Sequence, residues 1–520
     1  MVSALLVDAL NNPTKALQDL FATYVDDIDK FPSAVAAHFS SVFLKTDDIF
    51  REIPPLDVSH PPAIHPNRAL IRFRAMIQDN SPSPEMYLQV LEGNKCGGWG
   101  ISQELSDDSW SCGFDYSMLK ECHTMWAVTV PGEASWFIEG SERSCMVDPT
   151  HHPPQPHKFP IPDIPHIGVQ IKIYDGDLAR SLKLTDIATF VGILTSEPIG
   201  VESNDLPTVP TLHVLFHRMD SLESVEPLIH GHNAGIRESL MEWIASEALG
   251  GDRDAAEWVL LSAIAKVHSR VIPLLPPSLT LSRFPQPKEA SAIPTLSYVL
   301  SEILPLFITV PLSLGTLNKV NFTPESIEED LHSGVLQVSQ GTTILLTENG
   351  IQEGQLVEKG IMNIHAIQEL INSQTLEYKF PYSKFSFPSA ISFIICSEGG
   401  RSAFFQTHTN TPWQGDSSVD LYKSKTEVVT PSSEKLTAFR SFIFAAKASV
   451  GSILVSEETS EYIQNDFVRL RQGDQTITAD DLIHLMKVSR LLAASMGASE
   501  VTAEVWERTK ALDIRRKGRF

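Results

Sequence analysis

The spacing of apolar residues changes along this chain, and that change limits the possible folds more than any other feature. Between residues 4 and 43 apolar side chains recur every three or four positions, as at Leu17, Leu20 and Tyr24, which predicts helices. Near Arg72 the spacing becomes a strict alternation, which predicts strands with one buried face. The two periods belong to different regular elements. We therefore expect a helical N-terminal segment followed by a separate β-rich module.

Several short strands are predicted between residues 66 and 218. Ile71 and Phe73 alternate with Arg72 and Arg74, and the turn-rich DNSPSP that follows predicts a hairpin with the next strand. VQIKIYDGD repeats the alternation and ends in a predicted turn at Asp175. ATFVGILTSEPIG and TLHVLF add further strands. This pattern predicts a β-barrel or a β-sandwich.

A segment rich in proline and histidine, residues 146–166, separates the two halves of the β-rich module. Because proline cannot donate a hydrogen bond to a sheet, we expect an extended linker here. The histidines considered as metal ligands are His151, His152, His157 and His166. A flexible segment offers no neighbouring groups that would orient these imidazoles, so we expect no metal site.

From about residue 225 onward the chain alternates helices with short apolar strands, which is typical of an α/β domain. IRESLMEWIASEALGG predicts a helix that ends at Gly250, and Asp252 is expected to cap the next helix. LTLS predicts a strand at residues 279–282, with a helix expected to start near Ala290.

The stretch GTTILLTENG has the form of the metal-binding strand of a nucleotide hydrolase, in which an Asp-Glu pair positions Mg²⁺ and water. Here the pair is Thr347-Glu348, so one acid is missing. The loop after the preceding strand contains Pro285 and Pro287 and no glycine, and it therefore lacks the backbone donors of a phosphate-binding loop. These departures predict that ATP is neither bound nor hydrolysed.

The elements after this strand follow the order seen in AAA+ helicase cores. NIHAIQELI predicts a helix, NSQTLEYKFPYSKFSFP a hairpin, and AISFIICS a strand that ends in Ser397, where those cores have asparagine. The C-terminal stretch predicts two capped helices, the first with a capping box at Thr478 and Asp481. These helices resemble the lid of minichromosome maintenance (MCM) helicase subunits, but Asp480 stands where those subunits have a phosphate-contacting arginine.

Charge and cysteine content limit the partners of the chain. The net charge is −23, which opposes a broad electrostatic grip on nucleic acid, and we expect no stable direct binding to nucleic acid. The alternative is a nucleic-acid binder whose β-module uses Arg72, Arg74 and Tyr87. Five cysteines without a CxxC pair argue against a disulfide framework and a zinc ribbon. No secretory signal and no membrane span are expected.

Five sequence blocks resemble, in order, those of the MCM complex-binding protein family. The blocks are RFRAMIQD, VPGEASWF, IKIYDGD, GDRDAAEWVLLSAI and NDFVRLRQGDQTITADDL. They extend over nearly the whole chain, from Arg72 to Leu482, and several blocks in a fixed order arise by chance far less often than one short motif. The family's long middle linker is shortened here, and no strongly basic nuclear-localisation cluster is visible.

The resemblance implies a non-enzymatic DNA replication factor that binds MCM helicase subunits. It further implies support for assembly or import of the MCM hexamer, its removal from chromatin, and effects on sister-chromatid cohesion and cell division. A nuclear location is implied, with shuttling to the cytoplasm left open. We expect no catalytic residue, cofactor or small-molecule substrate. An active AAA+ ATPase is a further alternative, which Thr347, Asp480 and the glycine-free loop oppose.

The expected fold class is mixed α/β and multidomain, resembling an inactive MCM subunit. It comprises a helical N-terminal segment, a β-module like the oligonucleotide-binding (OB) fold, a degenerate AAA+-like core and a helical lid. The corresponding ranges are residues 1–60, 61–220, 221–460 and 461–520.

The hairpin within QTLEYKFPYSKF is the candidate partner-binding site. It carries Lys379, Tyr382 and Lys384 among aromatic neighbours. Cationic and aromatic side chains supply most of the binding energy in protein interfaces. The alternative is a sheet edge that lysines keep soluble.

Overall fold

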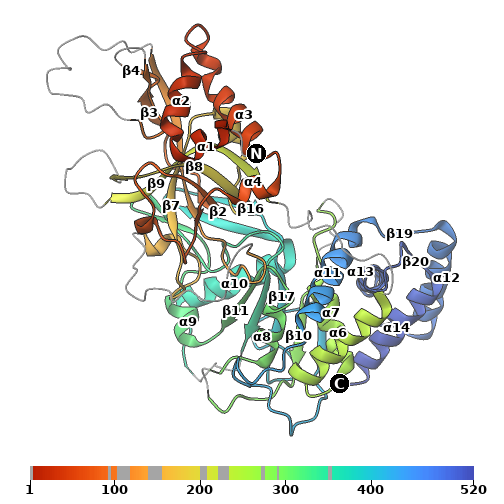
Figure 1. Cartoon of the computed structure of the whole chain (residues 1–520). Coiled ribbons are helices and arrows are strands. Elements are labelled where there is room, and N and C mark those ends of the chain that lie inside the picture. The colour runs from red at the N-terminus through yellow and green to blue at the C-terminus, as the bar shows by residue number, and fades with distance from the viewer. Residues whose placement is uncertain are drawn as a thin grey trace. The chain divides into compact units, whose positions relative to one another are not determined.

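The protein, described here by a computed structural model, forms two compact units (Figure 1). The first unit contains Met1–Pro131, Glu142–Ser221 and Pro324–Ser339, and the second contains Gly132–Ser141, Leu222–Thr323 and Gln340–Phe520. The structure describes residues 4–91, 95–101, 118–138, 155–198, 208–220, 233–270, 276–289, 292–348 and 354–520. Helices and sheets are both abundant, so the mixed α/β class is confirmed. The division into four sequence ranges stays a prediction.

Helices predicted near the N-terminus are present in the first unit. They are α1 (Ala4–Asn11), α2 (Pro13–Phe21), α3 (Phe31–Phe43) and α4 (Asp47–Arg51). Pro13 and Pro32 stand in the first turns of their helices, where a missing N–H costs little. The ring of Phe31 packs edge-on against Phe21 at 5.0 Å and against Trp99 at 5.4 Å between ring centroids. This aromatic cluster joins the helices to the β-rich part of the same unit.

Five strands of the first unit close into a barrel, one of the two arrangements expected from the sequence. They are β2 (Leu70–Asp79), β6 (Leu119–Val128), β7 (Gly168–Ile173), β8 (Ile187–Pro198) and β9 (Thr208–Met219). The order is β2-β8-β9-β7-β6, and β6 pairs again with β2. Within this ring only β7 and β9 run parallel. Inward side chains such as Phe73, Ile171 and Phe190 are fully buried, as the alternation requires.

The hairpin predicted across DNSPSP is wrong. β3 (Glu85–Leu88) does not pair with β2; each of these strands pairs with β6 instead. Closure of the barrel prevents the pairing of β3 with β2, because β2 already pairs with β8 along one edge and with β6 along the other. The turn expected at Asp175 is the start of α5 (Gly176–Ser181), whose first amides donate to the Asp175 carboxylate. Further short strands of this unit are β1 (Pro55–Leu56), β4 (Val90–Leu91) and β5 (Lys95–Cys96).

The described half of the proline- and histidine-rich segment packs against the barrel, although a loose linker was expected. It begins with a short 3₁₀ helix, η5 (Pro156–Lys158), and both Lys158 and Phe159 are buried. The Lys158 ammonium contacts the Asp79 carboxylate at 2.7 Å, because a buried cation needs a counter-charge. His166 stacks on Phe159 at 4.2 Å between ring centroids. His151 and His152 lie outside the described residues.

A hairpin distant in sequence also belongs to the first unit. It consists of β12 (Glu325–Ile327) and β13 (Asp330–His332). The Gln78 amide donates to the Leu331 carbonyl at 3.1 Å, and the Gln337 amide donates to the Gln78 carbonyl at 2.7 Å. These bonds hold the hairpin, and the segment that follows it, against strand β2.

The second unit is built on a five-stranded parallel sheet, which is consistent with the α/β pattern expected from the sequence. Its strands are β10 (Leu279–Ser282), β11 (Phe307–Pro311), β14 (Thr343–Thr347), β17 (Ser392–Cys396) and β18 (Thr409–Pro412). The order is β11-β14-β17-β10-β18, and every pairing is parallel. Every residue of β10, β14 and β17 is buried, because helices cover a parallel sheet on both faces.

Helices of the second unit largely match the sequence expectation. They are α6 (Asn233–Ala248), α7 (Arg253–Ala263), α8 (Thr295–Ser301), α9 (Leu314–Lys319), α10 (Glu358–Ser373) and α11 (Ser433–Ser449). Asp252 caps α7 by accepting a hydrogen bond from the Ala255 amide at 3.0 Å, which confirms that prediction. The helix expected near Ala290 begins instead at Thr295. Pro294 explains the shift, because proline disfavours helical backbone at the residue before it.

The C-terminal helices are α12 (Glu457–Gly473), α13 (Ala479–Ser495) and α14 (Ala503–Lys517), with β19 (Leu454–Val455) pairing with β20 (Glu500–Val501). The capping box of Thr478 and Asp481 is confirmed. Figure 1 shows α6 and α7 beside α13 and α14, and the Arg237 guanidinium donates to the Ser495 hydroxyl at 3.1 Å. Among the described residues, no helix is long and apolar enough to cross a bilayer.

Candidate functional site

The loop after β10 lies at the edge of the sheet where α/β proteins bind ligands, but its first two amides are already hydrogen-bonded within the fold. The N–H of Arg283 donates to the Gly399 carbonyl at 2.8 Å, and that of Phe284 donates to the Ser397 carbonyl at 2.9 Å. The two prolines that follow have no N–H. The Phe284 ring is buried, with the rings of Trp413 and Tyr422 beside it. Buried aromatic side chains therefore occupy this loop, where a nucleotide site would have backbone amides that bind phosphate.

Glu348, the residue after β14, is buried and engaged within the fold. One carboxylate oxygen accepts a hydrogen bond from the Ser402 hydroxyl, and the other accepts one from the Ala403 amide at 3.0 Å. Thr347 beside it carries no charge that would hold Mg²⁺. The remaining acid of the strand therefore fixes the turn after β17.

Two further sequence departures have local structural explanations. The Ser397 hydroxyl, at the position of the expected asparagine, donates to the Arg401 carbonyl at 3.1 Å. Asp480 is exposed in the first turn of α13, where a negative charge stabilises the positive end of the helix dipole. Each residue type suits its place in the fold without any role toward a nucleotide.

We expect the purified protein not to bind ATP measurably, with a Kd weaker than about 1 mM, because the amides of Arg283 and Phe284 are already bonded and Pro285 and Pro287 have no N–H to donate to phosphate. Calorimetric titration with Mg-ATP, together with a phosphate-release assay, measures this directly. Saturable binding in the micromolar range would contradict the prediction.

The candidate partner-binding hairpin forms as predicted. β15 (Thr375–Phe380) pairs antiparallel with β16 (Ser383–Pro388), and every residue of β16 is exposed. Tyr382 stands fully exposed in the turn, and Lys379 lies opposite Lys384 in the register. The structure therefore brings the three predicted residues to one end of the hairpin.

The two faces of this hairpin differ in chemistry, since directly opposed residues share a face. Lys379 and Lys384 share the charged face with Glu377, which contacts the Lys384 ammonium at 3.0 Å. The other face carries Phe385 and Phe387, whose exposed fractions are 53% and 37%. Exposed aromatic rings on an edge strand are unusual, because such edges invite pairing with other chains.

This arrangement suits a protein contact. The opposed ammonium groups of Lys379 and Lys384 repel each other across the two strands, so this pair does not stabilise the hairpin itself. Sequence reasoning found the lysines and Tyr382 but missed Phe385 and Phe387 as exposed anchors. Their signal was present in the alternation along β16, although alternation alone does not say which face is covered. The contact with a partner stays a prediction.

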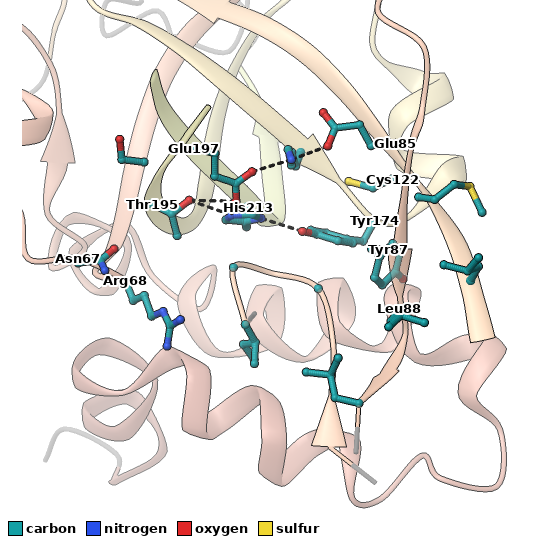
Figure 2. A pocket seen from close by; sticks show the side chains of 18 residues that line it. Asn67, Arg68, Glu85, Tyr87, Leu88, Cys122, Tyr174, Thr195, Glu197 and His213 are labelled. Atoms are coloured by element: carbon teal, nitrogen blue, oxygen red, sulfur yellow. Dashed lines mark hydrogen bonds and ion pairs between the residues drawn. The ribbon is translucent and has the colours of Figure 1, made fainter. Parts of the chain in front are cut away.

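A pocket of about 570 Å³ lies within the first unit (Figure 2). The rings of Tyr87 and Tyr174, perpendicular at 4.8 Å between centroids, line one part of it. His213 accepts or donates on both ring nitrogens, with the Tyr174 hydroxyl at 2.7 Å and the Thr195 hydroxyl at 2.9 Å. A Glu197 carboxylate oxygen lies 2.9 Å from the same His213 nitrogen as Thr195. The pocket thus combines an aromatic wall with a hydrogen-bonded polar wall.

The charged groups of the pocket are paired in a way that favours binding over acid–base chemistry. Lys172 contacts both Glu85 and Glu197 at 2.6 Å. Burial raises the pKa of Glu197, but hydrogen bonds and charge from His213 and Lys172 outweigh burial and lower the pKa to about 2. Burial raises the pKa of the Cys122 thiol to about 12. At neutral pH the carboxyl is therefore no proton donor, and the thiol is no nucleophile.

The arginines considered for nucleic-acid binding are engaged inside the first unit. Arg72 donates to the Ile53 carbonyl at 2.9 Å, and Arg74 pairs with Asp220 at 2.5 Å. Tyr87 lines the pocket described above. These contacts weaken the nucleic-acid alternative, because phosphate binding would have to compete with them.

Comparison with known proteins gives a consistent result along the chain. Residues 40–156 and 142–520 match the family model described as Mini-chromosome maintenance replisome factor. A protein of Arabidopsis thaliana is 31% identical over 383 residues, which cover 67% of this chain and 62% of the relative. Relatives from Salmo salar and Homo sapiens are 26% and 25% identical, and each alignment covers 97% or more of this chain and of the relative. All three relatives are named Mini-chromosome maintenance complex-binding protein.

Proposed function

The chain belongs to the mini-chromosome maintenance replisome factor family, and we propose that it is a DNA replication factor that binds MCM helicase subunits without hydrolysing ATP. The observation that carries the proposal is the match of this family over both compact units, from residue 40 to residue 520. The relatives are named as MCM complex-binding proteins, and these names suggest the partner. Support for assembly or import of the MCM hexamer, its unloading from chromatin and sister-chromatid cohesion are the proposed cellular roles, in the nucleus.

The architecture of each unit supports a molecule built like an MCM subunit. The first unit has a five-stranded barrel with one parallel pair and the short helix α5 between β7 and β8, an arrangement expected of an OB-like module. The second has an all-parallel sheet in which β10 lies between β17 and β18, followed by the helices α12 to α14. This order is the one expected of an AAA+-like core with a helical lid.

The state of the β10 loop supports a passive role for this second unit. A protein that resembles an MCM subunit but cannot bind nucleotide could take the place of a subunit in the MCM hexamer without hydrolysing ATP. The buried Phe284, the amides already bonded to Ser397 and Gly399, and the engaged Glu348 all favour such a protein. We propose that this explains how the chain would assist assembly and removal of the hexamer.

We expect the purified chain to bind recombinant MCM subunits with a Kd of about 1 µM or tighter, whether or not ATP is present. Gel filtration of the chain with each subunit in turn, followed by calorimetry of the pair that co-elutes, measures this. We expect this affinity to be independent of ATP, because the proposed contact requires no nucleotide bound to this chain. If no MCM subunit binds at about 10 µM, the proposed function is wrong.

A further inference from the structure

Three side chains that can bind metal ions come together in the first unit, and none of them lines the pocket described above. His157 lies in η5, whereas Asp330 and His332 lie on β13, and their ligand atoms are all within 4.8 Å of one another. His157 and Asp330 are 173 positions apart in the sequence. Sequence reasoning considered His157 only together with its neighbours in the proline-rich segment, so it missed this grouping.

The ligand atoms of the three groups lie close to the spacing that one bound ion would require. The Nε2 atom of His157 lies 2.6 Å from Asp330 Oδ2, and the rings of His157 and His332 stack at 4.1 Å between centroids. Zinc holds nitrogen and oxygen ligands at about 2.0–2.2 Å, which places two ligand atoms about 3.3 Å apart in a tetrahedral site. An ion would therefore replace the hydrogen bond between His157 and Asp330, and these two atoms would move apart to admit it. All three residues are partly exposed, so water can complete the coordination.

Neighbouring groups orient the ligands, which removes the reason for expecting no metal here. The other oxygen of Asp330, Oδ1, contacts the ammonium of the buried Lys158, which also contacts Asp79 at 2.7 Å. The main chain of His157 is fixed as well, since its carbonyl accepts a hydrogen bond from the Ser333 amide at 2.8 Å. Outer contacts of this kind hold ligating carboxylates and imidazoles in place in metal sites.

We propose that His157, Asp330 and His332 bind one divalent transition-metal ion, with Zn²⁺ as the best match. Two imidazole nitrogens and one carboxylate oxygen suit zinc and its neighbours, whereas Mg²⁺ and Ca²⁺ prefer sites made of oxygen alone. The ion would cross-link η5 to β13, and so tie two sequence-distant segments of the first unit together. The positive charge of the nearby Lys158 ammonium opposes binding of the metal ion. We therefore expect the affinity for Zn²⁺ to be only micromolar.

The test is a calorimetric titration of the metal-free full-length protein with Zn²⁺. We expect one ion per chain with a Kd of about 1–10 µM, and a weakening of about tenfold or more in H332A and in D330N. The matched control is H365A, which removes an exposed histidine elsewhere and should bind as the unchanged chain does. A weaker Zn²⁺ affinity in H365A together with an unchanged affinity in H332A would overturn the proposal. The absence of Zn²⁺ binding at 100 µM would overturn it as well.

A second measurement keeps the proposal testable if a variant folds poorly. Co²⁺ added to the unchanged chain should give the visible absorption of a four-coordinate ion, and Zn²⁺ should bleach that absorption. Zn²⁺ should also raise the melting temperature of the unchanged chain, because an ion that binds only the folded state stabilises it. A Co²⁺ spectrum typical of six-coordinate, hydrated ion would overturn the site.

Discussion

A K379E/K384E double variant is expected to bind MCM subunits about tenfold or more weakly than the unchanged chain. Both lysines lie on the charged face of the β15–β16 hairpin, and their reversal changes an attraction into a repulsion for an acidic partner surface. The fold should survive, since among the described residues the ion pair lost is that of Lys384 with Glu377, and exposed pairs contribute about 0–1 kcal/mol. Calorimetry with the MCM subunit that binds best measures the change.

The matched control for this variant is K425E/K435E. These two lysines are also exposed in the second unit, and their reversal changes the net charge by the same amount. A loss of affinity in both double variants would point to a general charge effect, and the hairpin would no longer be supported. Y382A and F385A test the aromatic contribution separately. Unchanged binding by a normally folded K379E/K384E variant would remove the hairpin from the interface.

Deleting residues 478–520 is expected to unfold the second unit. The deleted helices bury Leu491, Leu492, Trp506 and Leu512 almost completely. Burial of each large apolar side chain contributes about 1.5–3 kcal/mol, so the loss approaches or exceeds the whole stability of a domain, about 5–15 kcal/mol. The melting profile should lose the transition of this unit, and limited proteolysis should cut within it.

Charged contacts add to this effect. The Arg519 guanidinium contacts the Asp252 carboxylate at 2.6 and 2.8 Å, and both side chains are nearly buried. Deletion would leave Asp252, which also caps α7, without its main counter-charge. The single variant W506A should cost about 3–5 kcal/mol, whereas I514A, at an exposed position, should cost less than about 0.5 kcal/mol. An unchanged melting profile of the truncated chain would contradict the role given to these helices.

Local patterns in the sequence were sufficient for much of the fold. The helical spacing around Leu17, the capping box at Thr478 and the cap at Asp252 depend on residues within one turn of each other, so they could be predicted without any tertiary information. The missing glycines before Lys288 are a property of the loop itself. The prediction of an inactive nucleotide loop therefore rested on the chemistry of a few consecutive residues.

Strand pairing and side-chain exposure required the tertiary structure. β2 and β3 are neighbours in sequence and were expected to pair, but closure of the barrel gives both to β6. The alternation along β16 places Phe385 and Phe387 on one face, yet only packing decides that this face stays partly exposed. Burial is a property of the whole unit, and a period of two residues cannot report it.

Long-range encounters were the other part that the sequence alone could not supply. Glu348 meets Ser402 across 54 positions, and His157 meets Asp330 across 173, with no local pattern to connect them. The sequence by itself determined which regular elements form and which loop cannot cradle phosphate, because those properties depend on neighbouring residues. Tertiary structure decided which strands pair, which aromatic rings remain exposed and which ionisable groups meet, because contacts between distant segments depend on how the whole chain packs.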